Sequence, residues 1–474
     1  MHLPIHLDRN CGEPLQNQLF EQLRCLIMSG RLKPDTRIIA TRFLGQQLNI
    51  SRTTVLLAYE RLIAEGYLET RPAIGTFVSR LLPGAAPAPR SVDLPARHHA
   101  GPSIDFTLMA DDRLFPCKPW LRIAQTVLDH QARHPALLQH RPHGSGSEAL
   151  RAVIGEWLAF HRGIVADPDQ IIVVSGIQQA LTVAATLAGV AGRSLLAESP
   201  GDRRAIGLFD SLGARRRDCP VDEYGLQTSR LPAEGAALAY VTPSRQRPLG
   251  GLLPLARREK LLDWAGRHRA LIIEDDSDGD FRYAGSAPPA LFSLDSQGAV
   301  IYLRGFSETL GAGLRLAYLV LPAGLLEAAR RLKAGLDDGA TWLEQRVLTE
   351  FIASGEYDRH LRTVRKTLLD RRDALSAALQ RQFGPVELWG MGAGTHLSWR
   401  LPAGMASAEF LARRAAEHGV QVYRPFPTSS DLRLADDMLL LGYGALEPAQ
   451  IEKGVGLLAD SLRTVPPALA GAAQ

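Results

Sequence analysis

The chain has 474 residues, of which 46% are hydrophobic and 22% are charged, and its formal net charge is +4. This composition is typical of a globular protein with room for one small and one large domain. The four cysteines lie far apart and form no CxxC or Cys/His ligand pattern, which argues against zinc sites and disulfide frameworks. No apolar run approaches the length of a membrane span and the N-terminus has no apolar signal core, so we expect a cytoplasmic protein without a membrane partner.

Three helices and a hairpin are predicted in the first eighty residues. Apolar side chains recur at spacings of three and four through the first helix, which Gly30 ends. Asn49 and Ile50 form a tight turn before Ser51, whose hydroxyl can cap the third helix. Two short strands then form a hairpin that would serve as a wing. The predicted helices span residues 14–29, 41–48 and 51–65, and the predicted strands span residues 67–70 and 76–78.

Polar side chains stand at the N-terminal end of the third helix, where a recognition helix contacts DNA. Residues 1–80 carry ten Lys or Arg and seven Asp or Glu, a balance that by itself is weak evidence for a polyanionic partner. A small helical cap with a solvated charged face would explain the helix spacing by itself better than a DNA-binding domain does. The candidate DNA-binding residues are Arg42, Ser51, Arg52, Thr53, Thr54 and Arg71.

Two stretches distinguish these interpretations: PLQNQLFEQLRCLIMSGRL, and SRTTVLLAYERLIAEGYLETRPAIGTFVS. They resemble the GntR-family winged helix-turn-helix nearly end to end, over about residues 11–79. The resemblance implies a DNA-binding domain over residues 1–80 with double-stranded operator DNA as its partner. Where the family commonly has Leu-Pro-Ser-Ser-Arg, this chain has residues 38–42, Ile-Ile-Ala-Thr-Arg. It keeps the arginine and the cap-competent Thr41 but loses the proline. We therefore expect that the domain still binds DNA and that its preferred operator sequence can differ from that of the family.

A proline-rich segment separates this region from the rest of the chain. Residues 80–103 contain five prolines without apolar periodicity, which predicts a partly extended linker over residues 81–103. Beyond it, short apolar strands alternate with helical stretches, which predicts an α/β domain over residues 104–474 with a largely parallel sheet. Long helices and further strands after residue 344 predict a smaller C-terminal α+β subdomain. The predicted sheet strands are residues 171–174, 195–198, 238–241, 271–273, 300–303 and 316–320.

Residues 300–322, VIYLRGFSETLGAGLRLAYLVLP, consist of two apolar strands around a polar turn. The segment resembles one in MocR-type regulators, a GntR branch in which the winged helix is fused to a fold-type I aminotransferase-like domain. That family has roughly FSKTL and then GLRLGY, and its lysine forms the Schiff base to pyridoxal phosphate. This chain has Glu308 at that place. A carboxylate cannot form an imine, so we expect no covalent binding of the cofactor that the resemblance implies.

Other positions match the cofactor site of that family. Gly176, Ile177 and Gln178 follow a strand and open a helix, so their backbone amides could hold a phosphate, although an ordinary strand-to-helix turn would look the same. The resemblance adds Ser307 and Arg315 to this phosphate cradle. It also matches Asp275 to the aspartate that pairs with the cofactor ring nitrogen. Alternatively, Asp275 only caps the loop that follows its strand.

Further positions depart from the family pattern. Ser277 stands where the family has a tyrosine that bonds the ring hydroxyl, and Asp202 stands where it has a stacking aromatic residue. Arg245 replaces a histidine, and Arg141 is a second new arginine in the pocket region. Changes in several segments that converge only in the fold indicate a pocket with a changed use. An ion network of Arg141, Arg245, Glu308 and Asp202, or a different ligand, could fill it.

Two functional hypotheses follow from these observations. In the first, the chain is a DNA-binding transcriptional regulator whose aminotransferase-like domain is catalytically inactive, supports a homodimer and receives a possible small-molecule effector. Fold-type I domains pair, and a dimer can hold two half-sites. In the second, the chain is a pyridoxal phosphate-dependent aminotransferase-family enzyme or a non-covalent sensor of that cofactor. Glu308 argues against the enzyme.

Overall fold

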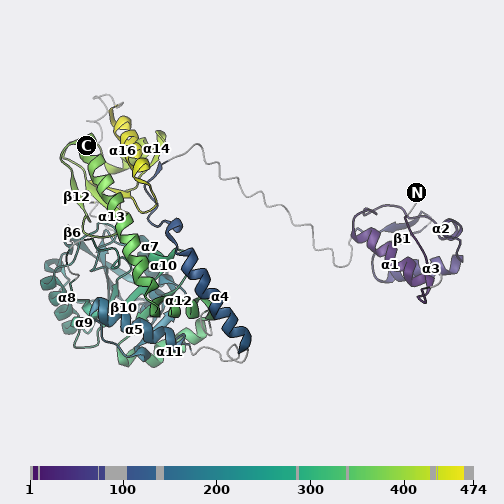
Figure 1. Cartoon of the computed structure of the whole chain (residues 1–474), viewed down its shortest axis with the longest axis horizontal. Helices are drawn as coiled ribbons and strands as arrows, with labels where there is room; N and C mark the ends of the chain where they lie inside the picture. The colour runs from purple at the N-terminus through teal and green to yellow at the C-terminus, as the bar shows by residue number, and fades with distance from the viewer. Residues whose placement is uncertain are drawn as a thin grey trace. The chain divides into compact units, whose positions relative to one another are not determined.

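The computed structural model describes residues 4–8, 11–72, 74–80, 104–134, 144–283, 285, 288–337, 341–426, 434 and 436–463. The chain forms two compact units, Met1–His98 and His99–Gln474 (Figure 1). The predicted linker and Arg141 lie outside the described residues. No helix in the described part of the chain is both long and apolar enough to cross a membrane. Nor do the described His, Cys, Asp and Glu side chains form a group of three or more that could hold a metal ion.

The first unit is a three-helix core with a two-stranded wing. Leucines on one side of α1 pack with Val55, Tyr59 and Leu62 of α3, all of which are buried. In the wing, Leu68 pairs with Val78 and Arg71 pairs with Gly75. These elements confirm the predicted winged helix-turn-helix. Their bounds are α1 Leu15–Met28, α2 Thr41–Leu48, α3 Arg52–Ala64, β1 Leu68–Arg71 and β2 Gly75–Val78.

The turn between α2 and α3 forms as the sequence predicts, and α2 spans the predicted residues Thr41–Leu48. Asn49 adopts the left-handed conformation with φ 53°, which Asn tolerates better than most residues. The Ser51 hydroxyl accepts a hydrogen bond from the Thr54 amide at 3.0 Å and so caps α3. At α2, however, the cap position is Ala40, no side chain caps the helix, and Thr41 is its first residue. Thr41, whose hydroxyl could cap a helix, is therefore the first residue of α2 and does not serve as its cap.

The second unit is built on an eight-stranded sheet in the order β4-β11-β10-β9-β8-β5-β6-β7. Alternate strand residues face opposite sides, as the period of two requires. Ile172 and Val174 contribute to a core with α6 and α7, while Ile171 and Val173 contribute to a core with α5 and α12. Helices therefore cover both faces (Figure 1). The strands are β4 Ile171–Val174, β5 Ser194–Ser199, β6 Arg215–Asp222, β7 Gly225–Leu226, β8 Leu238–Val241, β9 Leu271–Asp275, β10 Val300–Gly305 and β11 Ala317–Val320.

The sheet is mixed. Its five central strands β10, β9, β8, β5 and β6 run parallel, whereas β11 is antiparallel to both neighbours and β7 is antiparallel to β6. Every predicted strand of this sheet forms, while β6 and β7 are additions. The helices of this part are α4 Cys117–Arg133, α5 Glu148–Arg162, α6 Ile177–Leu187, α7 Arg203–Ser211, α8 Leu255–His268, α9 Leu291–Leu294, α10 Ser307–Leu310, α11 Leu326–Asp337 and α12 Trp342–Ala353.

A smaller α+β subdomain follows, as predicted. Its three-stranded sheet β12-β13-β15 packs with α13, α14 and α16 around a core that includes Trp399, Leu411 and Leu458. A short segment, β3 Ile104–Asp105, returns to pair with β14. The remaining elements are α13 Glu356–Phe383, β12 Glu387–Trp389, β13 His396–Arg400, α14 Ala408–Glu417, β14 Val420–Gln421, β15 Met438–Gly442 and α16 Pro448–Arg463.

Candidate functional site

The N-terminal end of α3 presents two of its predicted DNA-binding side chains to solvent and uses two others to start the helix. The hydroxyls of Ser51 and Thr54 are 2.8 Å apart and hydrogen-bonded to each other, and Ser51 also caps the helix. These hydroxyls are therefore occupied within the protein. Arg52 and Thr53 are exposed and project from the first turn. They are the side chains of this group that are best placed to contact a ligand.

Arg42 lies on the first turn of α2 and is also exposed. Among the described residues, neither Arg42 nor Arg52 forms an ion pair with a carboxylate. A guanidinium without a protein partner can neutralise a phosphate or donate two hydrogen bonds to guanine. The α2 and α3 N-termini thus each carry one available arginine.

Arg71, predicted as the wing arginine, is held by carboxylates of its own unit. Its Nε donates to Glu69 at 2.8 Å, its guanidinium pairs with Asp35, and it lies 4.3 Å from the centroid of the Phe77 ring. Hydrogen bonds from Arg71 and Arg80 lower the pKa of Asp35. Arg71 therefore has less charge available for DNA than the sequence indicates. Arg37 was not predicted as a DNA-binding residue. It is exposed and lies beside the wing, with its Nε 3.0 Å from the position that a Cβ atom on Gly75 would occupy.

In the second unit, the candidate residues gather at the carboxyl ends of the parallel strands, where open α/β sheets bind ligands. Asp275 ends β9 and is buried. One of its carboxylate oxygens accepts a hydrogen bond from the Tyr240 hydroxyl at 2.8 Å, and the other accepts from the amide of Ser277 at 3.0 Å and from its hydroxyl. Burial raises the pKa of Asp275 to about 6. Asp275 thus caps the turn that follows its strand, and both of its oxygens have protein donors.

Arg247 is the centre of an ion cluster beside Asp275. Its guanidinium donates to both carboxylate oxygens of Asp278, at 3.0 and 2.9 Å, and to Glu308 at 3.1 Å. The Asp202 carboxylate is 3.5 Å away. We call these four residues, Arg247, Asp278, Glu308 and Asp202, the Arg247 cluster. Burial lowers the pKa of Arg247, but the three carboxylates outweigh burial and raise it well above its usual value.

The central cation of the ion network is therefore Arg247 and not the predicted Arg245. Glu308 and Asp202 take part, but Arg245 lies deeper and reaches only one member of the cluster, Asp278, at 3.3 Å. Its other hydrogen bonds go to the carbonyls of Ala393 and His396, at 2.9 and 2.7 Å, and to the His396 ring at 3.2 Å. Asp202 also accepts hydrogen bonds from the amides of residues 204 and 205, so it caps α7.

Arg247 was missed although the sequence contains a signal for it. Residues 274–280 carry five carboxylates directly after a buried strand. Buried carboxylates need cationic partners, because an unpaired charge in the interior is costly. Six arginines distant in sequence meet this acidic run. They are Arg162, Arg245, Arg247, Arg258, Arg304 and Arg365.

The predicted phosphate cradle is partly assembled. Gly176 caps α6 with φ 91°, which favours glycine, and the Arg315 guanidinium lies 3.5 Å from where a Cβ on Gly176 would be. Ile177 and Gln178 form the first turn of α6, and Ser307 begins α10. A protein carboxylate also lies here, because Asp337 accepts a hydrogen bond from Gln179 of α6 at 3.0 Å. Lys333 pairs with Asp337, so the charge of this carboxylate is compensated and opposes a bound phosphate only weakly.

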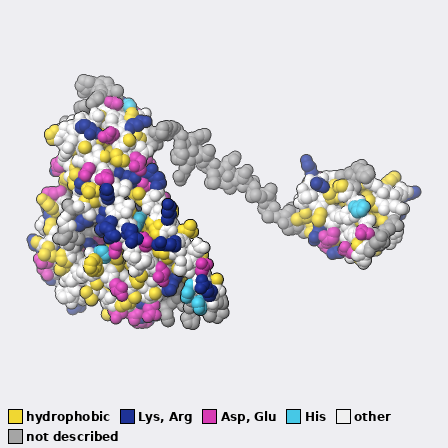
Figure 2. All heavy atoms as spheres, viewed as in Figure 1, with side chains coloured by type: hydrophobic (Ala, Val, Ile, Leu, Met, Phe, Trp, Pro, Cys, Tyr) yellow, Lys and Arg dark blue, Asp and Glu magenta, His cyan; other side chains and the backbone are white. Residues whose placement is uncertain are grey.

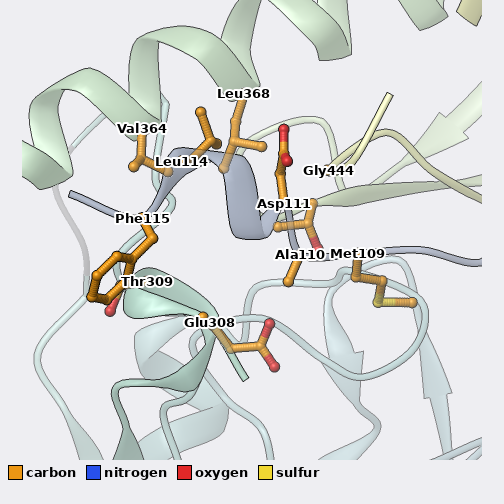
Figure 3. A pocket seen from close by; sticks show the side chains of 12 residues that line it. Met109, Ala110, Asp111, Leu114, Phe115, Glu308, Thr309, Val364, Leu368 and Gly444 are labelled. Atoms are coloured by element: carbon orange, nitrogen blue, oxygen red, sulfur yellow. The ribbon is translucent and has the colours of Figure 1, made fainter. Parts of the chain in front are cut away.

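A small cavity of about 10 Å³ lies next to Glu308, which is room for about one water molecule. Glu308 and Thr309 lie on one side of it and Asp111, Leu114 and Phe115 on the other (Figure 3). At the positions that the resemblance assigns to the ring, Asp202 and Ser277 offer neither a stacking aromatic residue nor a tyrosine hydroxyl, and Glu308 offers no amine. The residues present do not fit pyridoxal phosphate in the manner that the resemblance implies.

Lys and Arg side chains also gather on the outer surface of the second unit. In the space-filling view they form patches interspersed with Asp and Glu side chains (Figure 2). Mixed charge of this kind is typical of a solvated surface and does not by itself indicate a polyanionic partner. The candidate DNA-binding residues therefore remain those of the first unit.

Comparison with protein families gives two matches. Residues 15–78 match the family described as "Bacterial regulatory proteins, gntR family", and residues 122–436 match "Aminotransferase class I and II". The two matches fall in separate units of the structure. The first covers the three helices and the wing, and the second covers the large sheet and most of the smaller subdomain.

Similar proteins match along nearly the whole chain. An "Uncharacterized HTH-type transcriptional regulator YhdI" of Bacillus subtilis (strain 168) is 32% identical, covering 96% of this chain and 97% of that protein. The "Probable rhizopine catabolism regulatory protein MocR" of Rhizobium meliloti is 32% identical, covering 95% and 94%. The solved structure of LysN, an alpha-aminoadipate aminotransferase from Thermus thermophilus, has a TM-score of 0.68 at 28% identity, covering 77% of this chain and 92% of that one.

Proposed function

This chain belongs to the MocR-type branch of the gntR family of bacterial regulatory proteins, and we propose that its aminotransferase-like domain is a pseudoenzyme that serves regulation. The chain is a transcriptional regulator with a helix-turn-helix domain and an aminotransferase-like domain. The proposal adds that residues 1–80 bind an operator through Arg42, Arg52 and Thr53. It adds that residues 104–474 form a cytoplasmic homodimer that responds to a small-molecule effector.

The observation that carries the proposal is the Arg247 cluster. The aminotransferase-like domain and solved structures such as the LysN complex imply pyridoxal phosphate as the ligand of this fold. Here Glu308 supplies no amine, and its carboxylate is already bonded to Arg247 at 3.1 Å. Transaminase chemistry needs an amine nucleophile that forms an imine with the cofactor. The side chains at this site instead satisfy one another.

A non-covalent sensor of pyridoxal phosphate is the second candidate. It is favoured by Gly176 and Arg315, whose geometry suits a phosphate group at the start of α6. It is opposed by Ser277 and Asp202, which offer the ring neither a hydroxyl partner nor a stacking residue, whereas Asp337 at the same helix end is paired with Lys333. An absorption spectrum of the purified chain titrated with pyridoxal phosphate separates the candidates, since only a bound cofactor shifts the spectrum saturably.

We expect no covalent pyridoxyl adduct on residues 300–322. Position 308 lacks an amine, and the neighbouring hydroxyls of Ser307 and Thr309 cannot replace it. The full chain would be mixed with pyridoxal phosphate, reduced with borohydride, digested and analysed by mass spectrometry. A pyridoxal phosphate-loaded transaminase treated in parallel shows that the reduction works. A stoichiometric adduct on this segment would refute the pseudoenzyme assignment.

Glu308→Lys should not create a transaminase. The variant gains an amine beside the Arg247 guanidinium, a like charge that lowers the lysine pKa and does not prevent imine formation. Ser277 and Asp202 would still leave the ring without its hydroxyl partner and its stacking residue. Turnover of amino acids with a 2-oxo acid acceptor should stay at the level of the parent chain. Measurable turnover by this single variant would show that position 308 is the only lesion.

A further inference from the structure

Two exposed leucines lie on the helix that is placed to read DNA. Leu56 and Leu57 of α3 have 41% and 45% of their surface exposed. Neither contributes to the apolar core of the first unit, which takes Val55, Tyr59 and Leu62 from the same helix. Leu56 and Leu57 therefore lie outside this core. Single exposed leucines are common on protein surfaces, so their position on the helix decides their meaning.

That position is the DNA-facing side of α3. Residues three and four apart are neighbours on a helix surface, so Leu56 lies one turn beyond Arg52 and Leu57 one turn beyond Thr53. All four side chains are exposed, and they form one continuous surface on the side opposite the core. Glu60, also exposed, continues this surface by another turn. In a helix that lies along the major groove with Arg52 and Thr53 at base edges, Leu56 and Leu57 face the neighbouring bases.

We propose that Leu56 and Leu57 recognise the 5-methyl groups of thymines in the operator. The inference rests on the proposed DNA-binding function and specifies what the recognition helix reads. In the major groove, the thymine methyl is the only apolar group on a base edge, and an aliphatic side chain offers no hydrogen bond for the other edges. Arg52 and Arg42, without carboxylate partners among the described residues, supply the charge that brings this apolar pair against a polyanion.

The proposal defines an arrangement of bases. The N-terminal Arg52 takes a guanine or a phosphate, the leucines take thymines one helical turn along α3, and Glu60 can accept from a cytosine amino group. The operator half-site should therefore contain thymines at fixed positions beside the Arg52 contact. Polar residues in place of Leu56 and Leu57 would remove this requirement without removing the phosphate contacts.

The test removes only the methyl groups. The full chain would select its preferred duplexes from a random-sequence library, and each thymine of the selected site would then be replaced in turn by deoxyuridine. We expect affinity to fall about fourfold for each contacted methyl, the fold-change that corresponds to burying one methyl group. Replacement at flanking thymines should have no effect. Leu56→Ala should bind the thymine and deoxyuridine duplexes with equal affinity at one of the contacted thymine positions. Leu57→Ala should also do so at one of the contacted positions.

Met28→Ala is the matched control, because Met28 is 49% exposed at the end of α1 and should leave the methyl dependence unchanged. Equal affinity of the parent chain for thymine and deoxyuridine duplexes at every position overturns the inference alone. A methyl dependence that persists in both leucine variants also overturns it. If the parent chain selects no duplex, the DNA-binding proposal fails, and the inference fails with it. If the leucine substitutions change the oligomeric state and not the methyl dependence, the leucines form a protein contact and the inference is wrong.

Discussion

Arg247→Met should lower the free energy of unfolding of the second unit by about 3–5 kcal/mol, the cost of removing one partner of a buried ion pair. Asp278 is 4% exposed and loses its two-bond partner, keeping only Arg245 at 3.3 Å. Glu308 and Asp202 lose the cation between them and are left as neighbouring like charges. Methionine keeps most of the length of the arginine stem, so the loss is mainly electrostatic.

Tryptophan fluorescence during urea unfolding of the full chain measures this change, since all six tryptophans lie beyond residue 119 and report on the second unit. Arg381→Met is the control. Arg381 pairs with Glu452 at 2.9 Å with both side chains more than half exposed, and such pairs contribute about 1 kcal/mol or less. Equal effects of the two substitutions would show that the Arg247 cluster does not stabilise the pocket.

The Arg247 cluster also makes the stability of the second unit depend on pH. Burial raises the pKa of Asp278, but Arg247 and Arg245 outweigh burial and hold it well below its usual value. A carboxyl whose pKa is lower in the folded chain stabilises the fold fully above its unfolded pKa of about 3.9. That contribution is lost as the pH falls through the folded value. The loss in free energy of unfolding caused by Arg247→Met should therefore have its full value at neutral pH.

Arg52→Ala should reduce the preference for operator over random duplex by about 1–3 kcal/mol, because a bidentate contact to a base edge discriminates by that amount. Arg52 is the first residue of α3, is exposed, and has no carboxylate partner among the described residues. Gel-shift titrations on both duplexes at several salt concentrations separate the loss of preference from the loss of charge. If Arg52→Ala discriminates as well as the parent, α3 is not the reading helix.

Arg71→Ala is the matched comparison in the wing. Asp35 and Glu69 hold its guanidinium, so it is unsuited to a base contact. Its substitution should weaken binding to operator and random duplex about equally and lower the salt dependence by less than one counterion, because Asp35 and Glu69 already neutralise its charge. A selective loss of operator binding in Arg71→Ala would place the wing at base edges.

Local patterns predicted most of the secondary structure. The helices of the first unit begin and end within about one residue of the predicted positions, because amphipathic spacing, Gly30 and the Ser51 cap act over a few residues. The six predicted strands of the large sheet form because buried strands are short, apolar runs. The β6 strand was missed, since it begins Arg-Arg-Arg-Asp toward the edge of the sheet and has exposed alternate residues. A polar pattern of this kind does not distinguish a partly covered strand from a loop.

The sequence by itself determined that position 308 has no amine, since that is a property of one residue type. Only the tertiary structure decided which charges meet. Arg247 reaches Asp278 and Glu308 across 31 and 61 residues, and Arg71 reaches Asp35 across 36. Pairing over such separations depends on how strands and loops are placed, and several arginines compete for the same carboxylates. Charge composition could predict that the acidic run after β9 needs cations. Only the geometry of the folded sheet edge places Arg247 at the centre of the ion cluster.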